Sequence, residues 1–178
     1  EVFENVDPKL VEKICNDYIN LERLYNKYYQ LTPNQYSDTM SINEFGFRGS
    51  DFSYEKPHNT FRIFLVGGSA VFGVGSSSDE TTISGYLQKN LNNLPLSYSF
   101  QVINAGSPGA NSFGESELTE DVLLQFDPDM IIVYDGWNDI QLYDVFVEVS
   151  QERETVSLFL RDIKVLFPFY STPVLISE

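Results

Sequence analysis

The chain has 178 residues, of which 42% are hydrophobic and 15% aromatic, a composition that excludes a disordered chain and suits one globular domain. Its net charge of −15 argues against binding a nucleic-acid backbone, which needs a basic face, and against docking on an anionic membrane surface. The single cysteine, Cys15, excludes an internal disulfide, and no apolar run is long enough to span a bilayer.

The first predicted element is a helix from Pro8 to Leu31. Asp7 is a candidate N-cap, Pro8 suits the first helical position, and Pro33 is expected to end the helix. Apolar residues recur along it at three- and four-residue steps, namely Leu10, Ile14, Tyr18, Leu21, Tyr25 and Tyr28. This stripe either packs on the helix's own domain or binds a protein partner.

Residues 32–59 are predicted to form a polar connector, which contains the stretch SINEFGFRG at 41–49. Phe45 and Phe47 are predicted to be buried anchors of this connector. Arg48 is predicted to pair with a carboxylate, in a structural rather than a catalytic role. We therefore divide the chain into an N-terminal helix and connector, 1–59, and an α/β domain, 60–178.

The stretch FRIFLVGGSAVFGVG at 61–75 predicts a buried strand that ends in a tight turn. Its apolar run lacks polar alternation, as in strands buried on both faces of a sheet, and Gly67 and Gly68 permit a sharp turn. Ser69 follows at once, so its hydroxyl is expected at the C-terminal edge of the sheet, where open α/β sheets bind ligands. The alternative is an ordinary strand-to-helix connection with Ser69 as the helix N-cap.

Two other glycine-rich motifs do not fit this stretch. A phosphate-binding P-loop needs a lysine where Val74 stands, and a dinucleotide fingerprint that starts at Gly73 needs a glycine where Ser78 stands. The glycines are therefore not expected to bind nucleotide phosphates.

Helices and strands alternate along the rest of the chain. The predicted elements are a helix at 78–93, a strand at 100–103, a helix at 113–126 and a strand at 130–134. The helix at 78–93 is expected to bury Ile83, Leu87, Leu91 and Leu94. Polar loops follow the two strands, NAGSPGANS at 104–112 and DGWNDI at 135–140. Beyond them, 142–149 fits a helix or a strand, 152–167 is predicted to be helical, and 173–177 is a candidate strand.

This alternation predicts an α/β fold, with a parallel sheet, right-handed crossovers and helices on both faces. The three strands then end at the same edge of the sheet, and a polar loop containing glycine follows each of them. Three loops that are distant in sequence are thus expected to meet, which favours a functional site at this edge. Shared turn chemistry is the alternative explanation.

The three loops offer parts of an acyl-transfer site. Such a site needs a nucleophile, a base that takes its proton, and hydrogen-bond donors directed at the oxyanion. Ser69 can be the nucleophile, and its own backbone N–H can be one donor. A glycine N–H of the second loop and the side-chain amide of Asn138 can be further donors, each worth about 3 kcal/mol of transition-state stabilisation.

The same three blocks resemble the SGNH, or GDSL-like, hydrolase family. GGSAVFG at 67–73 is similar to its first block, with Gly68 where many members have Asp. NAGSPG at 104–109 is similar to the second block and GWND at 136–139 to the third. NEFGFRG at 43–49 also resembles the lead-in of envelope-associated members, which favours an extracytoplasmic or cell-envelope location over a cytoplasmic one.

The resemblance implies a flavodoxin-like, three-layer α/β/α sandwich and a serine-dependent activity on ester bonds. Ser69 would be the nucleophile, the N–H of Gly109 one oxyanion donor and the amide of Asn138 another, with Gly106 a lesser candidate for the second-block role. Family members are mostly esterases, lipases and carbohydrate acetylesterases or acyltransferases. They need no metal and no organic cofactor.

The chain departs from the family in its catalytic base. The family's fourth block, D-x-x-H, is absent, and the only histidine is His58, just before the first strand of the α/β domain. Because a strand rises about 3.3 Å per residue, His58 and Ser69 are expected to lie roughly 20 Å or more apart. We expect either a fragment whose missing C-terminal part carries the Asp–His pair, or a degenerate member that binds without catalysing, and favour the fragment.

Acidic residues of the third loop are weaker candidates for this role. Asp135, Asp139 and Asp144 are possible substitute bases, although Asp139 is better explained as a carboxylate that braces its loop. No metal site is expected from them, because no histidine or cysteine accompanies them.

The sequence thus predicts hydrolysis or transfer of an acyl group from a small-molecule or glycan ester. One rival prediction is a noncatalytic module that binds a glycan or a protein partner in the same cleft. Another is a structural component of the cell envelope, attached through the helix at 8–31.

Overall fold

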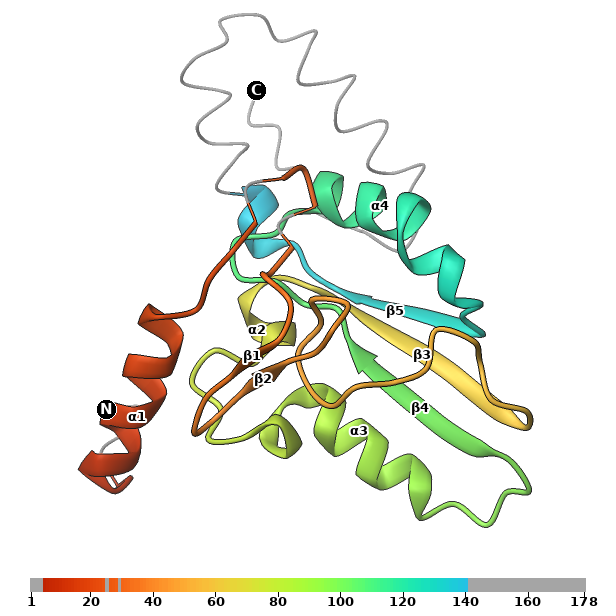
Figure 1. Cartoon of the computed structure of the whole chain (residues 1–178), viewed down its shortest axis with the longest axis horizontal. Helices are drawn as coiled ribbons and strands as arrows, with labels where there is room; N and C mark the ends of the chain where they lie inside the picture. The colour runs from red at the N-terminus through yellow and green to blue at the C-terminus, as the bar shows by residue number, and fades with distance from the viewer. Residues whose placement is uncertain (1–4, 25, 29, 141–178) are drawn as a thin grey trace, which may run out of the picture. The chain divides into compact units, whose positions relative to one another are not determined.

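The computed structural model of the chain describes residues 5–24, 26–28 and 30–140. The chain divides into two compact units, Glu1–Asp135 and Gly136–Glu178. The first unit contains helices and a three-stranded parallel sheet of order β4-β3-β5 (Figure 1). The predicted α/β class with a parallel sheet is confirmed, whereas the predictions for 142–149, 152–167 and 173–177 lie outside the described residues.

The central strand, β3 (Thr60–Gly67), pairs in parallel with a strand on each side. Its partner β4 (Ser99–Asn104) runs in register from Thr60 opposite Ser99 to Leu65 opposite Asn104. Its other partner, β5 (Met130–Tyr134), runs from Ile63 opposite Met130 to Gly67 opposite Tyr134. All three strands therefore end at one edge of the sheet, and the prediction that β3 is buried is confirmed by its last six residues.

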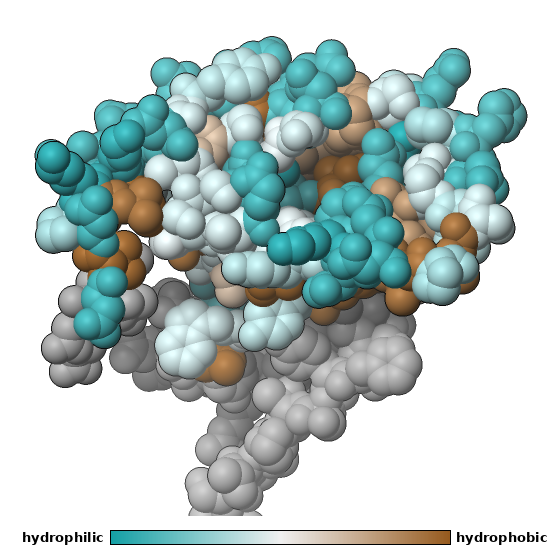
Figure 2. Space-filling view, turned by 90° about the horizontal axis from the view of Figure 1, so that it is seen from below, coloured by the Kyte–Doolittle hydropathy of each residue, from teal (hydrophilic) through white to brown (hydrophobic). Residues whose placement is uncertain are grey.

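The longest helix between β3 and β4 is α3 (Ile83–Asn92), and the longest between β4 and β5 is α4 (Ser112–Asp121). Figure 1 shows α4 on one side of the strands and α3 on the other. Right-handed crossovers that run in opposite directions across a sheet produce this arrangement. Seen from the side that carries α3, hydrophilic residues cover much of the described surface, with apolar residues in small groups between them (Figure 2).

The main hydrophobic core joins the connector to the sheet and to α4. Its buried members are Phe47, Phe64, Val66, Ile103, Ala105, Leu118, Leu123 and Phe126. The rings of Phe47 and Phe64 lie 5.7 Å apart, and Phe45 packs against Phe126 at 5.0 Å. The predicted anchoring is therefore confirmed for the buried Phe47, whereas Phe45 packs against the core but is only partly buried. Two short strands in the connector, β1 (Gln35–Tyr36) and β2 (Ser41–Ile42), pair antiparallel.

The N-terminal helix is shorter than predicted. Its start is as expected, with the Asp7 carboxylate accepting a hydrogen bond from the N–H of Lys9, but α1 spans only Pro8–Ile19. Asn20 is the C-cap, and its side-chain amide donates to the carbonyl of Asn16. An asparagine side chain competes for backbone groups in this way and disfavours helix continuation. The prediction of one helix to Leu31 that ends at Pro33 is thus wrong.

The helix that follows β3 also differs from its prediction. A short 3₁₀ helix, η1 (Asp79–Thr81), has Ser78 as its N-cap, and the Thr82 side chain caps α3 by accepting a hydrogen bond from the N–H of Gly85. Ile83 and Leu94 are exposed, and Leu87 and Leu91 are only half-buried, so the predicted buried stripe is wrong. Instead, the Gln88 side chain docks on the edge of β4 that faces away from β3, as its oxygen accepts the N–H of Val102 at 2.7 Å. Its nitrogen donates to the Phe100 carbonyl at 3.0 Å.

The predicted helix at 113–126 is divided in two. After α4 ends at Asp121, a short 3₁₀ helix, η2 (Leu123–Phe126), brings Leu123 and Phe126 into the core. Within the described ranges, no helix combines the length and the apolar character needed to cross a bilayer.

Arg62, in the first half of β3, is fully buried. Its guanidinium donates to the side-chain oxygen of Gln101 at 2.6 Å and to the Phe126 carbonyl at 2.7 Å. It also donates to the carbonyls of Ser53 at 2.9 Å and Tyr54 at 3.0 Å. Burial lowers the pKa of Arg62, and the nearby Asp127 and Asp129 carboxylates oppose that shift. Arg62 thus ties the connector and the end of η2 to β3.

Replacing Phe64 with alanine tests the core. Phe64 is fully buried on the central strand, whereas Phe113 is 61% exposed on α4. We expect Phe64→Ala to lower the free energy of unfolding by about 3–5 kcal/mol, since it leaves a cavity. The control Phe113→Ala is expected to change it by about 0.5 kcal/mol or less. Urea unfolding measures both, and equal losses would contradict this packing.

Candidate functional site

Ser69 lies where the sequence predicts it, on the turn that follows β3. Gly67 ends the strand, Gly68 is the N-cap, and Ser69 is the first residue of the short helix α2 (Ser69–Phe72). Ser69 is exposed, although Val71 and Phe72 behind it are buried. The alternative interpretation of Ser69 as the helix N-cap is therefore wrong, and its side chain faces solvent at the C-terminal edge of the sheet.

Gly67 allows the close packing that this turn needs. A Cβ at this position would overlap the carbonyl oxygen of Tyr134 in β5 and would lie 2.5 Å from Cγ2 of Val71 in α2. Only glycine lets the strand end directly beneath the helix that carries Ser69.

The loop after β4 lies against this turn. The N–H of Ser107 donates to the carbonyl of Gly67 at 2.9 Å. A Cβ at Gly106 would overlap the backbone nitrogen of Phe72 and lie 2.8 Å from the carbonyl carbon of Val71. The structure thus brings together the loops that carry Ser69 and Gly109, as the parallel topology predicts.

Gly106 and Gly109 differ in the hydrogen bonding of their backbone N–H groups. The N–H of Gly106 donates to the Asn104 side-chain oxygen at 3.0 Å, so this N–H is already engaged. Gly109 is exposed, has a φ of +87°, and has open space around the position of a Cβ. In the part of the chain that the structure describes, the N–H of Gly109 donates no hydrogen bond. This geometry favours Gly109 over Gly106 as a donor to a ligand.

Arg23 contacts the Gly109 loop from the N-terminal segment, a contact that the sequence does not predict. Its guanidinium donates to the carbonyl oxygen of Pro108 at 3.2 Å and to the Tyr18 hydroxyl at 3.1 Å. The Pro108 carbonyl and the Gly109 N–H belong to one planar peptide group. The hydrogen bond from Arg23 therefore helps to fix the direction of the Gly109 N–H.

Asn138 belongs to the second unit, of which residues 136–140 are described. Residues 137–140 form a helical turn, in which the N–H of Ile140 donates to the carbonyl of Gly136 at 3.3 Å. The expected meeting of Asn138 with Ser69 stays a prediction. So does the loop-bracing role of Asp139, and Asp144 lies outside the described residues.

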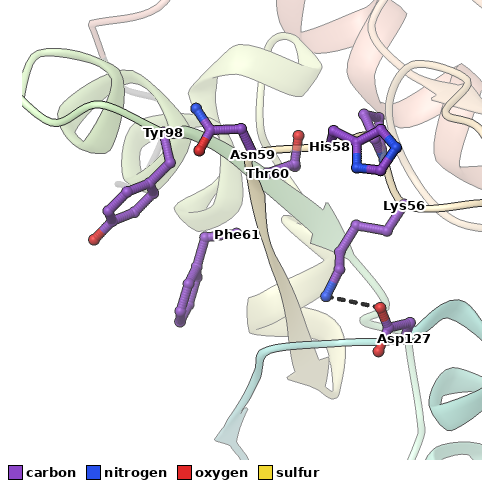
Figure 3. A pocket seen from close by; sticks show the side chains of 8 residues that line it. Lys56, His58, Asn59, Thr60, Phe61, Tyr98 and Asp127 are labelled. Atoms are coloured by element: carbon purple, nitrogen blue, oxygen red, sulfur yellow. Dashed lines mark ion pairs between the residues drawn. The ribbon is translucent and has the colours of Figure 1, made fainter.

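His58 lies just before β3, at the opposite end of the strand from Ser69, as predicted. It lines a pocket of about 440 Å³ together with Phe61 and Tyr98 (Figure 3). In the same pocket, the Lys56 ammonium pairs with the Asp127 carboxylate at 2.9 Å. The length of β3 therefore separates this imidazole from the Ser69 hydroxyl.

Comparison with known proteins gives no match, either to the models of protein families or among curated proteins. Within the described part of the chain, no group of three or more histidine, cysteine, aspartate or glutamate side chains could hold a metal ion. The functional interpretation therefore depends on the two adjoining loops that follow β3 and β4.

Alanine at the two glycines of the second loop separates their roles. Gly106→Ala forces a Cβ against the backbone of α2, so we expect a loss of about 3 kcal/mol in the free energy of unfolding. Gly109→Ala meets no neighbour and is strained only by its positive φ, so we expect a loss of about 1 kcal/mol. Urea unfolding of both variants checks the order, and a larger loss for Gly109→Ala would contradict the geometry.

Proposed function

We propose that the chain is an SGNH-type hydrolase or acyltransferase that acts on ester bonds of a small molecule or a glycan. The observation that carries the proposal is the packing of the Gly106–Gly109 loop against the turn that presents Ser69. The strand order β4-β3-β5 supports it, because it corresponds to the 2-1-3 part of the flavodoxin-like order 2-1-3-4-5. A three-layer α/β/α sandwich of this type is the finer fold assignment that we propose.

In the proposed reaction, Ser69 Oγ attacks the carbonyl carbon of the ester while a general base takes the hydroxyl proton. The tetrahedral intermediate carries its negative charge on the former carbonyl oxygen. The N–H of Gly109 and the side-chain amide of Asn138 donate hydrogen bonds to that oxygen. Collapse of the intermediate breaks the ester C–O bond, and the protonated base gives its proton to the leaving oxygen, so that the alcohol departs. The acyl-serine that remains is then cleaved by water or an acceptor alcohol.

The proposed reaction needs a general base, and His58 is not in a position to be that base. His58 is the chain's one histidine, and β3 separates it from Ser69. A serine hydroxyl is a weak nucleophile near neutral pH unless a base close to it accepts its proton. The proposed activity therefore depends on an Asp–His pair that this chain does not contain.

A noncatalytic binding module is the second candidate function, and the position of His58 is the observation that favours it. In that case the same edge of the sheet would bind a glycan or a protein partner without forming a covalent bond. The two functions differ in whether Ser69 reacts with an electrophile.

A fluorescent organophosphonate, which modifies activated serines, tests this difference on the full-length protein. We expect one covalent label at Ser69, located by peptide mass analysis, and its loss in Ser69→Ala. Ser77→Ala is the matched control, because Ser77 lies in the loop that follows the same turn and should leave labelling unchanged. A folded protein that takes no label at Ser69 would contradict nucleophilic catalysis and support the binding module.

Asn138→Ala tests the proposed oxyanion site. Losing one such donor typically lowers kcat by about 10²–10³-fold, because the hydrogen bond forms chiefly in the transition state. We expect this loss with little change in KM, measured with a chromogenic ester that the full-length protein hydrolyses. Asn90→Ala, at an exposed position on α3, is the control and should keep the wild-type kcat. An unchanged kcat in Asn138→Ala would remove Asn138 from the site.

A further inference from the structure

Arg48 of the connector is a buried cation that contacts the turn carrying Ser69. Its side chain is only 1% exposed, and its Nε pairs with an Asp79 carboxylate oxygen at 2.8 Å, as the sequence predicts. Its Nη1 donates to the carbonyls of Phe72 at 3.1 Å and Gly73 at 2.9 Å, and its Nη2 to the carbonyl of Thr39 at 3.1 Å. Burying a charge is costly, so such a residue is retained only where its partners compensate for it.

Two of the partners of Arg48, the carbonyls of Phe72 and Gly73, lie at the C-terminal end of α2. This helix has four residues, and the last carbonyls of any helix lack partners within it. A helix so short is unstable without outside contacts. Arg48 satisfies the carbonyls of Phe72 and Gly73, and its guanidinium also stacks on the Phe72 ring at 5.0 Å.

Asn104, the last residue of β4, also forms hydrogen bonds with α2. Its side-chain nitrogen donates to the carbonyls of Val71 at 3.0 Å and Phe72 at 3.3 Å. Arg48 and Asn104 are themselves joined, because the backbone N–H of Arg48 donates to the Asn104 carbonyl at 3.2 Å. The two side chains thus tie the connector, β4 and the Ser69 turn into one hydrogen-bonded unit.

We propose that Arg48 is a positioning residue for Ser69. The Arg48 guanidinium binds the carbonyls at the C-terminal end of α2. Ser69, at the N-terminal end of this one-turn helix, therefore keeps one orientation. Asp79 fixes the guanidinium in turn, and its second carboxylate oxygen accepts hydrogen bonds from the N–H and hydroxyl of Ser41 in β2. The inference rests on the proposed function, because it gives Arg48 a task only if Ser69 reacts.

Arg62 is a matched control for Arg48. Both are buried arginines that donate mainly to backbone carbonyls, but Arg62 lies in the first half of β3, away from the Ser69 turn. Arg48→Lys and Arg62→Lys each keep the positive charge and replace the planar fork of donors with a single ammonium. A role in general stability predicts the same behaviour for both variants.

The experiment measures local opening and reactivity in the full-length protein, at a temperature where both variants are folded. Local opening is followed by amide exchange at Gly73 and Val74, whose N–H groups both donate to the Ser69 carbonyl at 3.0 Å. We expect Arg48→Lys to exchange there at least tenfold faster than Arg62→Lys, and to react with the organophosphonate at least tenfold more slowly.

The outcomes separate the inference from the proposed function. If Ser69 is labelled in the wild type, but the two variants show equal exchange at Gly73 and Val74 or equal labelling rates, the role of Arg48 is overturned and the proposed function stands. If the folded wild-type protein takes no label, the proposed function fails, and the positioning of a nucleophile by Arg48 fails with it.

Discussion

The parallel pairing of β3 with β4 and β5 is the constraint on which the rest of the structure depends. Because the ladder places Leu65 opposite Asn104 and Gly67 opposite Tyr134, the chain leaves all three strands at one edge. A shift of register by one residue would turn the buried side chains of β3 to the opposite face, so the core fixes the pairing. The sheet therefore decides which loops can meet, before any side chain of those loops is considered.

The position of Ser69 then depends on the close approach of the backbone at Gly67 and Gly106 to neighbouring segments. Gly67 and Gly106 leave room for α2 above the strand ends, and substituents at either position would overlap backbone atoms. Arg48 and Asn104 supply the hydrogen bonds that so short a helix lacks at its C-terminal end. An exposed serine on a turn anchored by the buried Val71 and Phe72 suits the proposed nucleophile, since its reactive atom must be accessible and its backbone rigid.

The parts of the fold that the sequence predicts are those with a strong local signal. Residues 130–134 form a strand as predicted, because an uninterrupted apolar run bounded by polar turns has few other conformations. The anchoring by Phe47 and the Arg48–Asp79 ion pair were also predictable in kind, since neither an isolated phenylalanine nor an isolated arginine is stable in a core without partners. The C-terminal end of α1 and the start of α3 were not predictable, because Asn20 and Thr82 act through caps that compete closely with helix continuation.

Contacts between segments that are distant in the sequence could not be predicted, because no sequence pattern indicates them. Arg23 and Pro108 are 85 residues apart, and the Gln88 amide meets the edge of β4 through backbone groups that any residue carries. The family resemblance already favours Gly109 over Gly106, and the hydrogen bond from the Gly106 N–H to the Asn104 side chain adds a physical reason that needed coordinates. The meeting of the loops after β3 and β4 was thus predictable from the sequence, whereas the contacts that hold these loops in place were not.

We propose that Ser69, Gly109 and Asn138 surround one small volume at this edge of the sheet. A crystal structure of the full-length protein measures this directly. We predict a point that is about 3 Å from the Gly109 nitrogen and the Asn138 amide nitrogen and within reach of Ser69 Oγ. An Asn138 amide directed away from the serine hydroxyl, or a Gly109 N–H beyond hydrogen-bonding distance of that point, would contradict it.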